Sequence, residues 1–335
     1  MSDARKPAGD QGNSSWMSLV ADVEVEVPSL STLDEVIAFR ADPSRDLSRH
    51  NVDLPANVDV HDVTIRERDG YATTAEICVP KGEGPFPTML YMHGGGWCWG
   101  KAEYVRKLAM SIAARGHVVV NLSYALAPEH PFPYALEESI HAVRWMSANA
   151  REWNGAPGPV AIGGASAGAN LAAATIVALN APEPLLPERE LAGAEVEFSA
   201  ALFLYGIFNF PLLMQVPNSH AGGFAETLYN QAYLGPHWLT KHRDPLVSPA
   251  LADSLERFPP TYLAVGSNDA LLPQTLDMTG RLAEAGVPTS ASVAAGLDHS
   301  YAYIPHKLPD SARELETFLA WLAKRTGADA LEVEQ

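Results

Sequence analysis

Short, uninterrupted runs of apolar residues recur through most of the chain, and stretches with helical spacing lie between them. The apolar runs cover residues 88–92, 118–122, 160–162, 200–204, 262–265 and 290–293. Runs of this length predict strands that are buried on both faces of a sheet. The stretches with helical spacing lie near residues 103–115, 134–150, 168–180, 273–286 and 310–325. The alternation predicts an α/β fold with a mostly parallel sheet and helices on both of its faces.

Two segments before this alternation have patterns of their own. Residues 58–79 alternate between apolar and polar positions and are interrupted at Asp69-Gly70, which predicts an antiparallel hairpin. Residues 31–40 have helical spacing, and either Ser31 or Thr32 is a suitable N-terminal cap.

The composition along the chain predicts a core with added segments. Residues 1–20 are polar and rich in Gly and Ser, whereas residues 206–248 are aromatic and irregular and interrupt the alternation. The predicted organisation, in chain order, is a disordered tail (1–20), an N-terminal cap segment (21–57), a core in two parts (58–205 and 249–326), a cap insertion between them (206–248) and a C-terminal tail (327–335).

Charge and composition exclude several classes of function. Forty acidic and twenty-three basic residues give a net charge of −17, which disfavours binding to nucleic acid or to an anionic membrane surface. The sequence has neither an apolar stretch of membrane-spanning length nor an apolar signal segment near its start, so we expect a cytoplasmic protein. Cys78 and Cys98 do not form a disulfide framework, and the spacing of His and Cys suggests no metal site. We expect neither a metal nor a cofactor.

The segment Gly164-Ala165-Ser166-Ala167-Gly168 stands between a predicted strand and a predicted helix. A serine there lies on a sharp strand-to-helix turn, which is tolerated when small residues flank it, as Gly164 and Gly168 do. The free N–H groups at the start of the helix stabilise negative charge that develops beside the serine. Ser166 is therefore the candidate nucleophile, and the N–H of Ala167 is a candidate oxyanion donor.

A second glycine-rich segment, His93-Gly94-Gly95-Gly96-Trp97, follows the predicted strand at 88–92. Bare backbone N–H groups can approach a carbonyl oxygen there because no side chain stands in the way. We expect Gly94 and Gly95 to be oxyanion donors and Gly96 to serve the turn.

A serine nucleophile needs an imidazole that accepts its proton and a carboxylate that orients the imidazole. His299 follows the predicted strand at 290–293, and Asp269 follows the one at 262–265, so both lie at the carboxyl ends of strands, where ligands bind. Asp298 competes for the role of the acid, but neighbouring residues rarely point their side chains at each other. The other histidines after Ser166 are interpreted as solvated side chains: His220, His237, His242 and His306.

With these motifs the chain resembles the hormone-sensitive lipase family of α/β-hydrolase esterases, over most of residues 60–325. The matching segments are His93–Gly96, Tyr124–Pro133, the turn at Ser166, Asp244-Pro245 with Ser248-Pro249, Asp269-x-Leu271, and His299. The resemblance implies the α/β-hydrolase fold and ester hydrolysis through an acyl-enzyme, with Ser166, Asp269 and His299 as the triad. It also implies a cap built from the N-terminal segment and residues 206–248. Because family members are often dimers, a homodimer is expected from the resemblance alone.

The sequence departs from the family pattern at several positions. Ala165 replaces an acidic residue and Ala125 an arginine, which suggests the hypothesis of a lost ion pair. Ser300 stands where a glycine commonly follows the histidine, and Trp97 and Trp99 crowd the oxyanion loop. These changes concern the choice of substrate more than the type of reaction.

The residues therefore predict a serine carboxylesterase for small or medium acyl esters, and the aromatic insertion suggests an aromatic alcohol group. The candidate pocket residues are Trp97, Phe208, Phe210 and Tyr301, although core packing alone would also explain aromatic residues there. An amide or formamide hydrolase of the same fold is the nearest alternative. A non-catalytic receptor for a small molecule is a third, which the presence of His299 disfavours.

Overall fold

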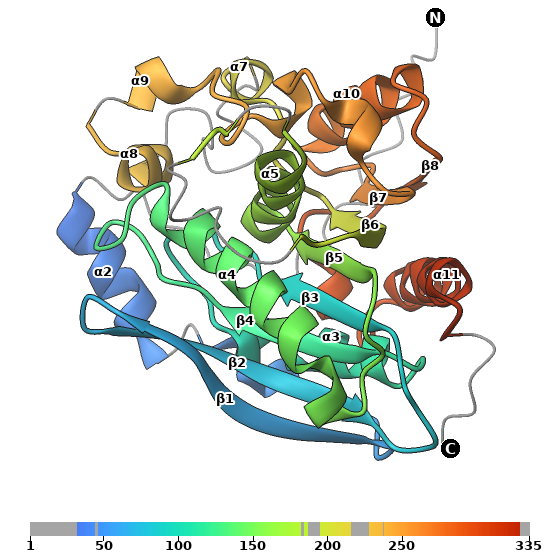
Figure 1. Ribbon diagram of the computed structural model, residues 1–335. Coiled ribbons are helices and arrows are strands. Elements are labelled where there is room, and N and C mark those ends of the chain that lie inside the picture. The colour runs from blue at the N-terminus through green and yellow to red at the C-terminus, as the bar shows by residue number, and fades with distance from the viewer. Residues whose placement is uncertain are drawn as a thin grey trace, which may run out of the picture.

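The computed structural model describes residues 32–43, 46–181, 184–186, 195–215, 228–236 and 238–328. They form an eight-stranded sheet with helices on both faces (Figure 1), so the predicted α/β-hydrolase architecture is confirmed. The predicted N-terminal tail, residues 21–31 and 216–227 of the two cap segments, and residues 329–335 lie outside the described residues.

Each predicted apolar run falls within a strand. The strands are β1 (Val58–Arg68), β2 (Tyr71–Pro80), β3 (Thr88–Met92), β4 (Val118–Ser123), β5 (Val160–Ala165), β6 (Phe198–Leu204), β7 (Thr261–Gly266) and β8 (Thr289–Ala294). The longer helices are α2 (Leu33–Ala41), α3 (Arg106–Ala113), α4 (Tyr134–Asn149), α5 (Ala167–Asn180), α8 (Leu228–Leu234), α10 (Leu272–Glu284) and α11 (Pro309–Thr326). Short helical turns include α7 (Phe210–Leu213), α9 (Trp238–Lys241), η2 (Leu47–His50), η3 (Ala102–Val105), η5 (Pro249–Leu251) and η7 (Tyr301–Tyr303).

The order of strands in the sheet is β1-β2-β4-β3-β5-β6-β7-β8. The predicted hairpin is confirmed, because β1 and β2 pair in antiparallel fashion and Arg68 faces Tyr71 across the turn at Asp69-Gly70. β2 and β4 are also antiparallel, and every later pair of neighbours is parallel. The carboxyl ends of β3, β5 and β7 therefore lie at the same edge of the sheet.

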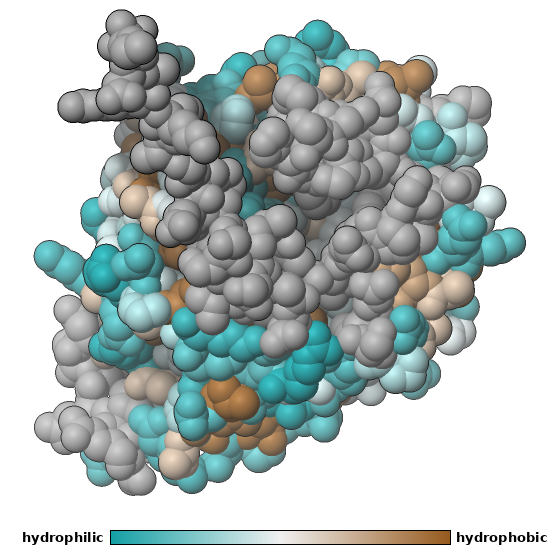
Figure 2. Space-filling view, turned by 180° about the vertical axis from the view of Figure 1, so that it is seen from behind, coloured by the Kyte–Doolittle hydropathy of each residue, from teal (hydrophilic) through white to brown (hydrophobic). Residues whose placement is uncertain are grey.

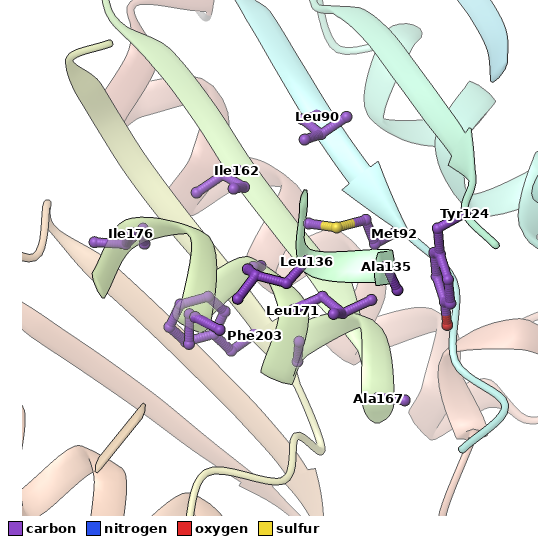
Figure 3. Close-up of a cluster of buried hydrophobic side chains, with 14 of the residues drawn as sticks. Leu90, Met92, Tyr124, Ala135, Leu136, Ile162, Ala167, Leu171, Ile176 and Phe203 are labelled. Atoms are coloured by element: carbon purple, nitrogen blue, oxygen red, sulfur yellow. The ribbon is translucent and has the colours of Figure 1, made fainter. Parts of the chain in front are cut away.

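The core is divided between the two faces of the sheet. Successive side chains of a strand point to opposite faces, and in β3 Leu90 and Met92 lie in one buried cluster while Met89 and Tyr91 lie in the other. α4, α5 and α10 cover the first face, where Leu136 and Ile162 share one cluster (Figure 3). α3 and α11 cover the second face. Burial on both sides explains why the central strands are uninterrupted apolar runs.

One expectation about the sheet is wrong. The run at 290–293 was expected to be buried on both faces, but β8 is an edge strand and most of its residues are partly or fully exposed. Val293 is 45% exposed. Among the described strands, β8 pairs with β7 alone, so it lacks the cover that the central strands receive.

α2 begins where the sequence predicts a helix. Thr32 is its cap: the Thr32 hydroxyl accepts from the N–H of Glu35, and the Glu35 carboxylate accepts from the N–H of Thr32. This reciprocal pair satisfies two backbone donors at the start of the helix. α2 packs against α8, which belongs to the 206–248 segment (Figure 1).

On the face shown in Figure 2, the visible described residues are mostly hydrophilic, and hydrophobic side chains stand among them in small groups. Within the described ranges, no helix is both long and apolar enough to cross a membrane.

Candidate active site

Ser166 lies on the sharp turn between β5, which ends at Ala165, and α5, which begins at Ala167. Its φ of 53° and ψ of −119° are strained for a residue with a side chain, as the sequence predicts. A Cβ on Gly168 would lie 2.2 Å from the carbonyl oxygen of Met92, and one on Gly164 would lie 2.5 Å from the backbone of Gly168. The turn therefore packs so closely against the end of β3 that only glycine fits at positions 164 and 168, two residues before and two residues after the serine.

The structure brings the three predicted triad residues together. His299 Nε2 lies 3.1 Å from Ser166 Oγ, and His299 Nδ1 lies 2.8 Å from Asp269 Oδ2. The other carboxylate oxygen of Asp269 accepts from the N–H of Leu271 at 2.8 Å. Asp269 is buried at 4% exposure, so its carboxylate is held by these contacts. With the proton on Nδ1, Nε2 is free to accept the serine proton.

Asp298, the competing acid, makes a different contact. Its Oδ1 accepts from the backbone N–H of His299 at 2.8 Å, while Asp269 contacts the His299 ring. The next residue, Ser300, has a φ of 62°, in the left-handed region that favours glycine. This conformation explains why, in the hormone-sensitive lipase family, a glycine is common directly after the histidine.

The surroundings of His299 favour its charged form. Burial lowers the pKa of the imidazole, but the Asp269 carboxylate outweighs burial through its charge and its hydrogen bond, and Asp298 adds to this attraction. The net result is a pKa above the usual value of 6.5. An imidazolium formed at His299 by uptake of a proton would therefore be stabilised by the site.

The three predicted oxyanion donors lie in two segments, the loop after β3 and the first turn of α5. The N–H of Ala167 is in the first turn of α5, where the N–H groups have no partner within the helix. Within the described residues, the structure records no hydrogen bond from the N–H of Gly95. The N–H of Gly94 donates to the hydroxyl of Tyr303 at 3.2 Å. Sequence reasoning missed Tyr303, because only its place four residues after His299 connects it to the site.

The four candidate pocket residues are all buried, at 0–1% exposure. Trp97, in the loop after β3, stacks on Phe210 and Tyr233 with ring centroids 5.7 Å and 4.4 Å apart. Phe208 packs against Phe203 of β6. Aromatic residues of the 206–248 segment thus pack inward against the oxyanion loop, and their contact with a substrate stays a prediction.

The remaining sequence expectations concern residues outside this arrangement. The backbone N–H of Ala125 donates to the Glu138 carboxylate at 2.6 Å. Ala165 lies in the buried cluster on the second face of the sheet, together with Tyr91. These contacts do not test the hypothesis of a lost ion pair, which stays a prediction. The ring of His306 packs against His50, and His220 and His237 lie outside the described residues.

The described residues contain no group of three or more His, Cys, Asp or Glu side chains that could hold a metal ion. Cys78 and Cys98 are buried free thiols. Burial raises the pKa of both thiols far above the usual value, so neither is a reactive thiolate.

Known proteins are similar to this chain in sequence and in fold. A profile of the alpha/beta hydrolase fold matches residues 89–303. Esterase LipI of Mycobacterium tuberculosis is 30% identical over 223 residues, which cover 64% of this chain and 65% of LipI, slightly less than two thirds of that relative. Versiconal hemiacetal acetate esterase of Dothistroma septosporum is 30% identical over 302 residues, which cover 86% of this chain and 87% of that enzyme.

Among solved structures, one from a study of two fungal esterases of Rhizomucor miehei is similar over 92% of this chain and 96% of its own, with 26% identity and a TM-score of 0.75. The family profile alone covers more than half of the chain. This chain therefore belongs to the hormone-sensitive lipase-like family of the alpha/beta hydrolase fold.

Proposed function

We propose that this protein hydrolyses small or medium acyl esters through an acyl-enzyme intermediate on Ser166. The observation that carries the proposal is the continuous chain of contacts from Ser166 Oγ to His299 Nε2 at 3.1 Å and from His299 Nδ1 to Asp269 Oδ2 at 2.8 Å. Membership in an esterase family supports it independently.

In the first half of the reaction, Ser166 Oγ attacks the carbonyl carbon while its proton passes to His299 Nε2. The carbonyl oxygen becomes negative, and we assign its stabilisation to the N–H groups of Gly94, Gly95 and Ala167. His299 then donates the proton to the alkoxy oxygen, the bond between carbonyl carbon and alkoxy oxygen breaks, and the alcohol leaves. Asp269 holds the imidazole in place and stabilises its charged form.

In the second half, a water molecule replaces the alcohol. It gives a proton to His299 Nε2 and attacks the carbonyl carbon of the acyl-enzyme, and the new intermediate faces the same N–H groups. The proton returns to Ser166 Oγ as the carbon–oxygen bond breaks, which releases the carboxylic acid.

The preference for small or medium acyl groups is supported by the packing around the loop after β3. Trp97, Phe208, Phe210 and Tyr301 together leave little exposed surface there. The relative from Dothistroma septosporum is named for an acetate ester, which is a short acyl group.

We also propose that α2 and the 206–248 segment form a cap over the site. α2 packs against α8, and Arg40 of α2 donates to the carbonyl oxygens of Cys98 at 3.4 Å and Ala127 at 3.1 Å. The same side chain pairs with Glu129. These contacts join the cap helix to the two loops that follow β3 and β4.

We also propose that the protein forms a homodimer and that it is cytoplasmic. Sedimentation velocity tests the first proposal, and cell fractionation tests the second.

The deciding experiment compares p-nitrophenyl esters of increasing acyl length with p-nitroacetanilide, using the wild type and Ser166→Ala. We expect turnover of short and medium esters, little turnover of the anilide, and loss of activity in Ser166→Ala with unchanged folding by circular dichroism. Equal turnover of ester and anilide would instead favour an amide hydrolase. Absence of turnover, together with no labelling of Ser166 by a fluorophosphonate, would favour the receptor.

A further inference from the structure

Tyr303 connects the loop that carries His299 to the loop that follows β3. It is the last residue of η7, four positions after His299, and its N–H donates to the carbonyl oxygen of Ser300 at 3.1 Å. Its hydroxyl accepts from the N–H of Gly94 at 3.2 Å, across 209 positions of sequence. Tyr303 therefore occupies the N–H group that the sequence assigned to the oxyanion.

The Tyr303 hydroxyl also borders the nucleophile. The point where a Cβ would stand on Gly94 lies 3.2 Å from the Tyr303 hydroxyl oxygen and 3.3 Å from Ser166 Cβ. Both atoms therefore adjoin the same small space beside the reacting serine. A carbonyl group attacked by Ser166 has to enter this neighbourhood, where the hydroxyl is already present.

Neighbouring rings hold Tyr303 in this position. The Tyr205 ring packs edge-on against Tyr303, with centroids 6.4 Å apart at 85°, and against His299, with centroids 4.9 Å apart at 64°. Tyr205 is fully buried, whereas Tyr303 is partly exposed. The fixed ring and the partly exposed side chain together are typical of a group that faces a substrate.

The hydrogen bond from Gly94 leaves the proton of the phenol to be donated. A phenolic oxygen accepts through its lone pairs and donates through its single proton, and the N–H of Gly94 uses a lone pair. An N–H that donates to a hydroxyl also polarises it and makes its proton a stronger donor. The pair therefore forms a short relay that begins at the Gly94 backbone and ends at the phenol proton.

We propose that Tyr303 is a further catalytic residue of this esterase, whose hydroxyl donates to the oxygen that becomes negative in the tetrahedral intermediate. In place of the direct contact assigned above, the N–H of Gly94 then acts on that oxygen through the Tyr303 hydroxyl, while Gly95 and Ala167 donate directly. This inference rests on the proposed esterase reaction at Ser166. It adds a side-chain donor to a site otherwise made from backbone N–H groups.

The protonation of Tyr303 is compatible with this role. Burial raises the pKa of Tyr303 above the usual value of 10, and the contacts of its hydroxyl with the Gly94 N–H and the Tyr205 side chain offset this only in part. The hydroxyl therefore keeps its proton at neutral pH and acts as a neutral donor, not as a base.

The first test is Tyr303→Phe, which removes the hydroxyl and keeps the ring. Loss of one oxyanion donor lowers kcat about 100-fold, and KM stays within about threefold because the contact forms only in the transition state. Tyr91→Phe is the matched control: its hydroxyl is buried nearby in β3 with no hydrogen-bond partner in the described part of the chain, so kcat should not change. A Tyr303→Phe kcat within twofold of the wild type overturns the proposal.

The second test separates donation to substrate from simple support of the Gly94 loop. Replacing Tyr303 with tyrosines that carry one, two or three ring fluorines makes the phenol a stronger donor and a weaker acceptor without removing it. Donation to the oxyanion predicts that kcat for p-nitrophenyl acetate rises along the series at pH 7. A hydroxyl that only accepts from Gly94 gives a falling series, which contradicts the proposal. Wild-type turnover and its loss in Ser166→Ala are measured first, so failure of the esterase reaction itself is distinguished.

Discussion

Replacement of Asp269 by asparagine tests the arrangement of the triad most directly. One oxygen of Asp269 accepts from the backbone N–H of Leu271 and the other from His299 Nδ1, both at 2.8 Å. In Asp269→Asn the amide oxygen can keep only one of these contacts. If it stays on the Leu271 N–H, the NH₂ group faces Nδ1, which must then accept a hydrogen bond, so the imidazole proton moves to Nε2.

The magnitude follows from the tautomer. An imidazole that carries its proton on Nε2 cannot accept the proton of Ser166, and the equivalent change in a serine protease triad lowers kcat about 10⁴-fold. At 1.36 kcal/mol for each factor of ten, this is about 5.4 kcal/mol of lost transition-state stabilisation. The side chain keeps its shape, so we expect the melting temperature to change little.

The assay is kcat for p-nitrophenyl acetate in Asp269→Asn and in Asp298→Asn. Asp298 accepts from the backbone N–H of His299, and an asparagine oxygen can keep that bond. The control should therefore lose less than tenfold. Our reasoning is refuted if Asp269→Asn keeps more than about a tenth of the wild-type kcat, or if Asp298→Asn loses as much as Asp269→Asn.

Three further predictions concern pH, the turn and the cap. The pKa of His299 is raised above 6.5, and only the neutral imidazole accepts a proton. We therefore expect kcat/KM to fall as the pH drops, with a midpoint above 6.5. A profile that stays flat down to pH 5 contradicts this. Gly168→Ala should lower the free energy of unfolding in urea by at least about 3 kcal/mol, because the added Cβ would overlap the backbone of β3. The control Gly280→Ala, at an open position on α10, should raise it by up to about 1 kcal/mol, and equal effects of the two variants would contradict the packing argument. Arg40→Ala removes the contacts of α2 with the carbonyl oxygens of Cys98 and Ala127, so it should raise KM severalfold with a smaller change in kcat. The control Arg313→Ala removes an exposed ion pair and should change neither constant. An unchanged KM in Arg40→Ala argues against the cap.

The motifs at Ser166 and at His93–Gly96 locate the proposed reaction from sequence because their requirements are local. A strained turn needs glycines on either side of the serine, and the packing of Gly164 and Gly168 against neighbouring backbone shows why. Apolar runs likewise predict the central strands. Because both faces of these strands are buried, their residues do not alternate between apolar and polar side chains. The chain also places Ser166 after β5, Asp269 after β7 and His299 after β8, each at the carboxyl end of a strand.

Other features depend on contacts between distant segments, and local patterns do not encode them. Asp269 and Asp298 both stand beside predicted strands, and only the fold shows that the first contacts the His299 ring while the second contacts its backbone. The exposure of β8 follows from its place at the edge of the sheet, which an apolar run does not specify.

The sequence by itself determined the sharp turn at Ser166, where we propose the nucleophile, as well as the glycine-rich loop and the alternation of strands and helices. Each of these depends on neighbouring residues and on the period of their side chains. Only the tertiary structure decided what the N–H of Gly94 contacts. The Tyr303 hydroxyl comes from 209 positions away, and a hydrogen bond across that separation exists only once the loops after β3 and β8 have been brought to the same edge of the sheet.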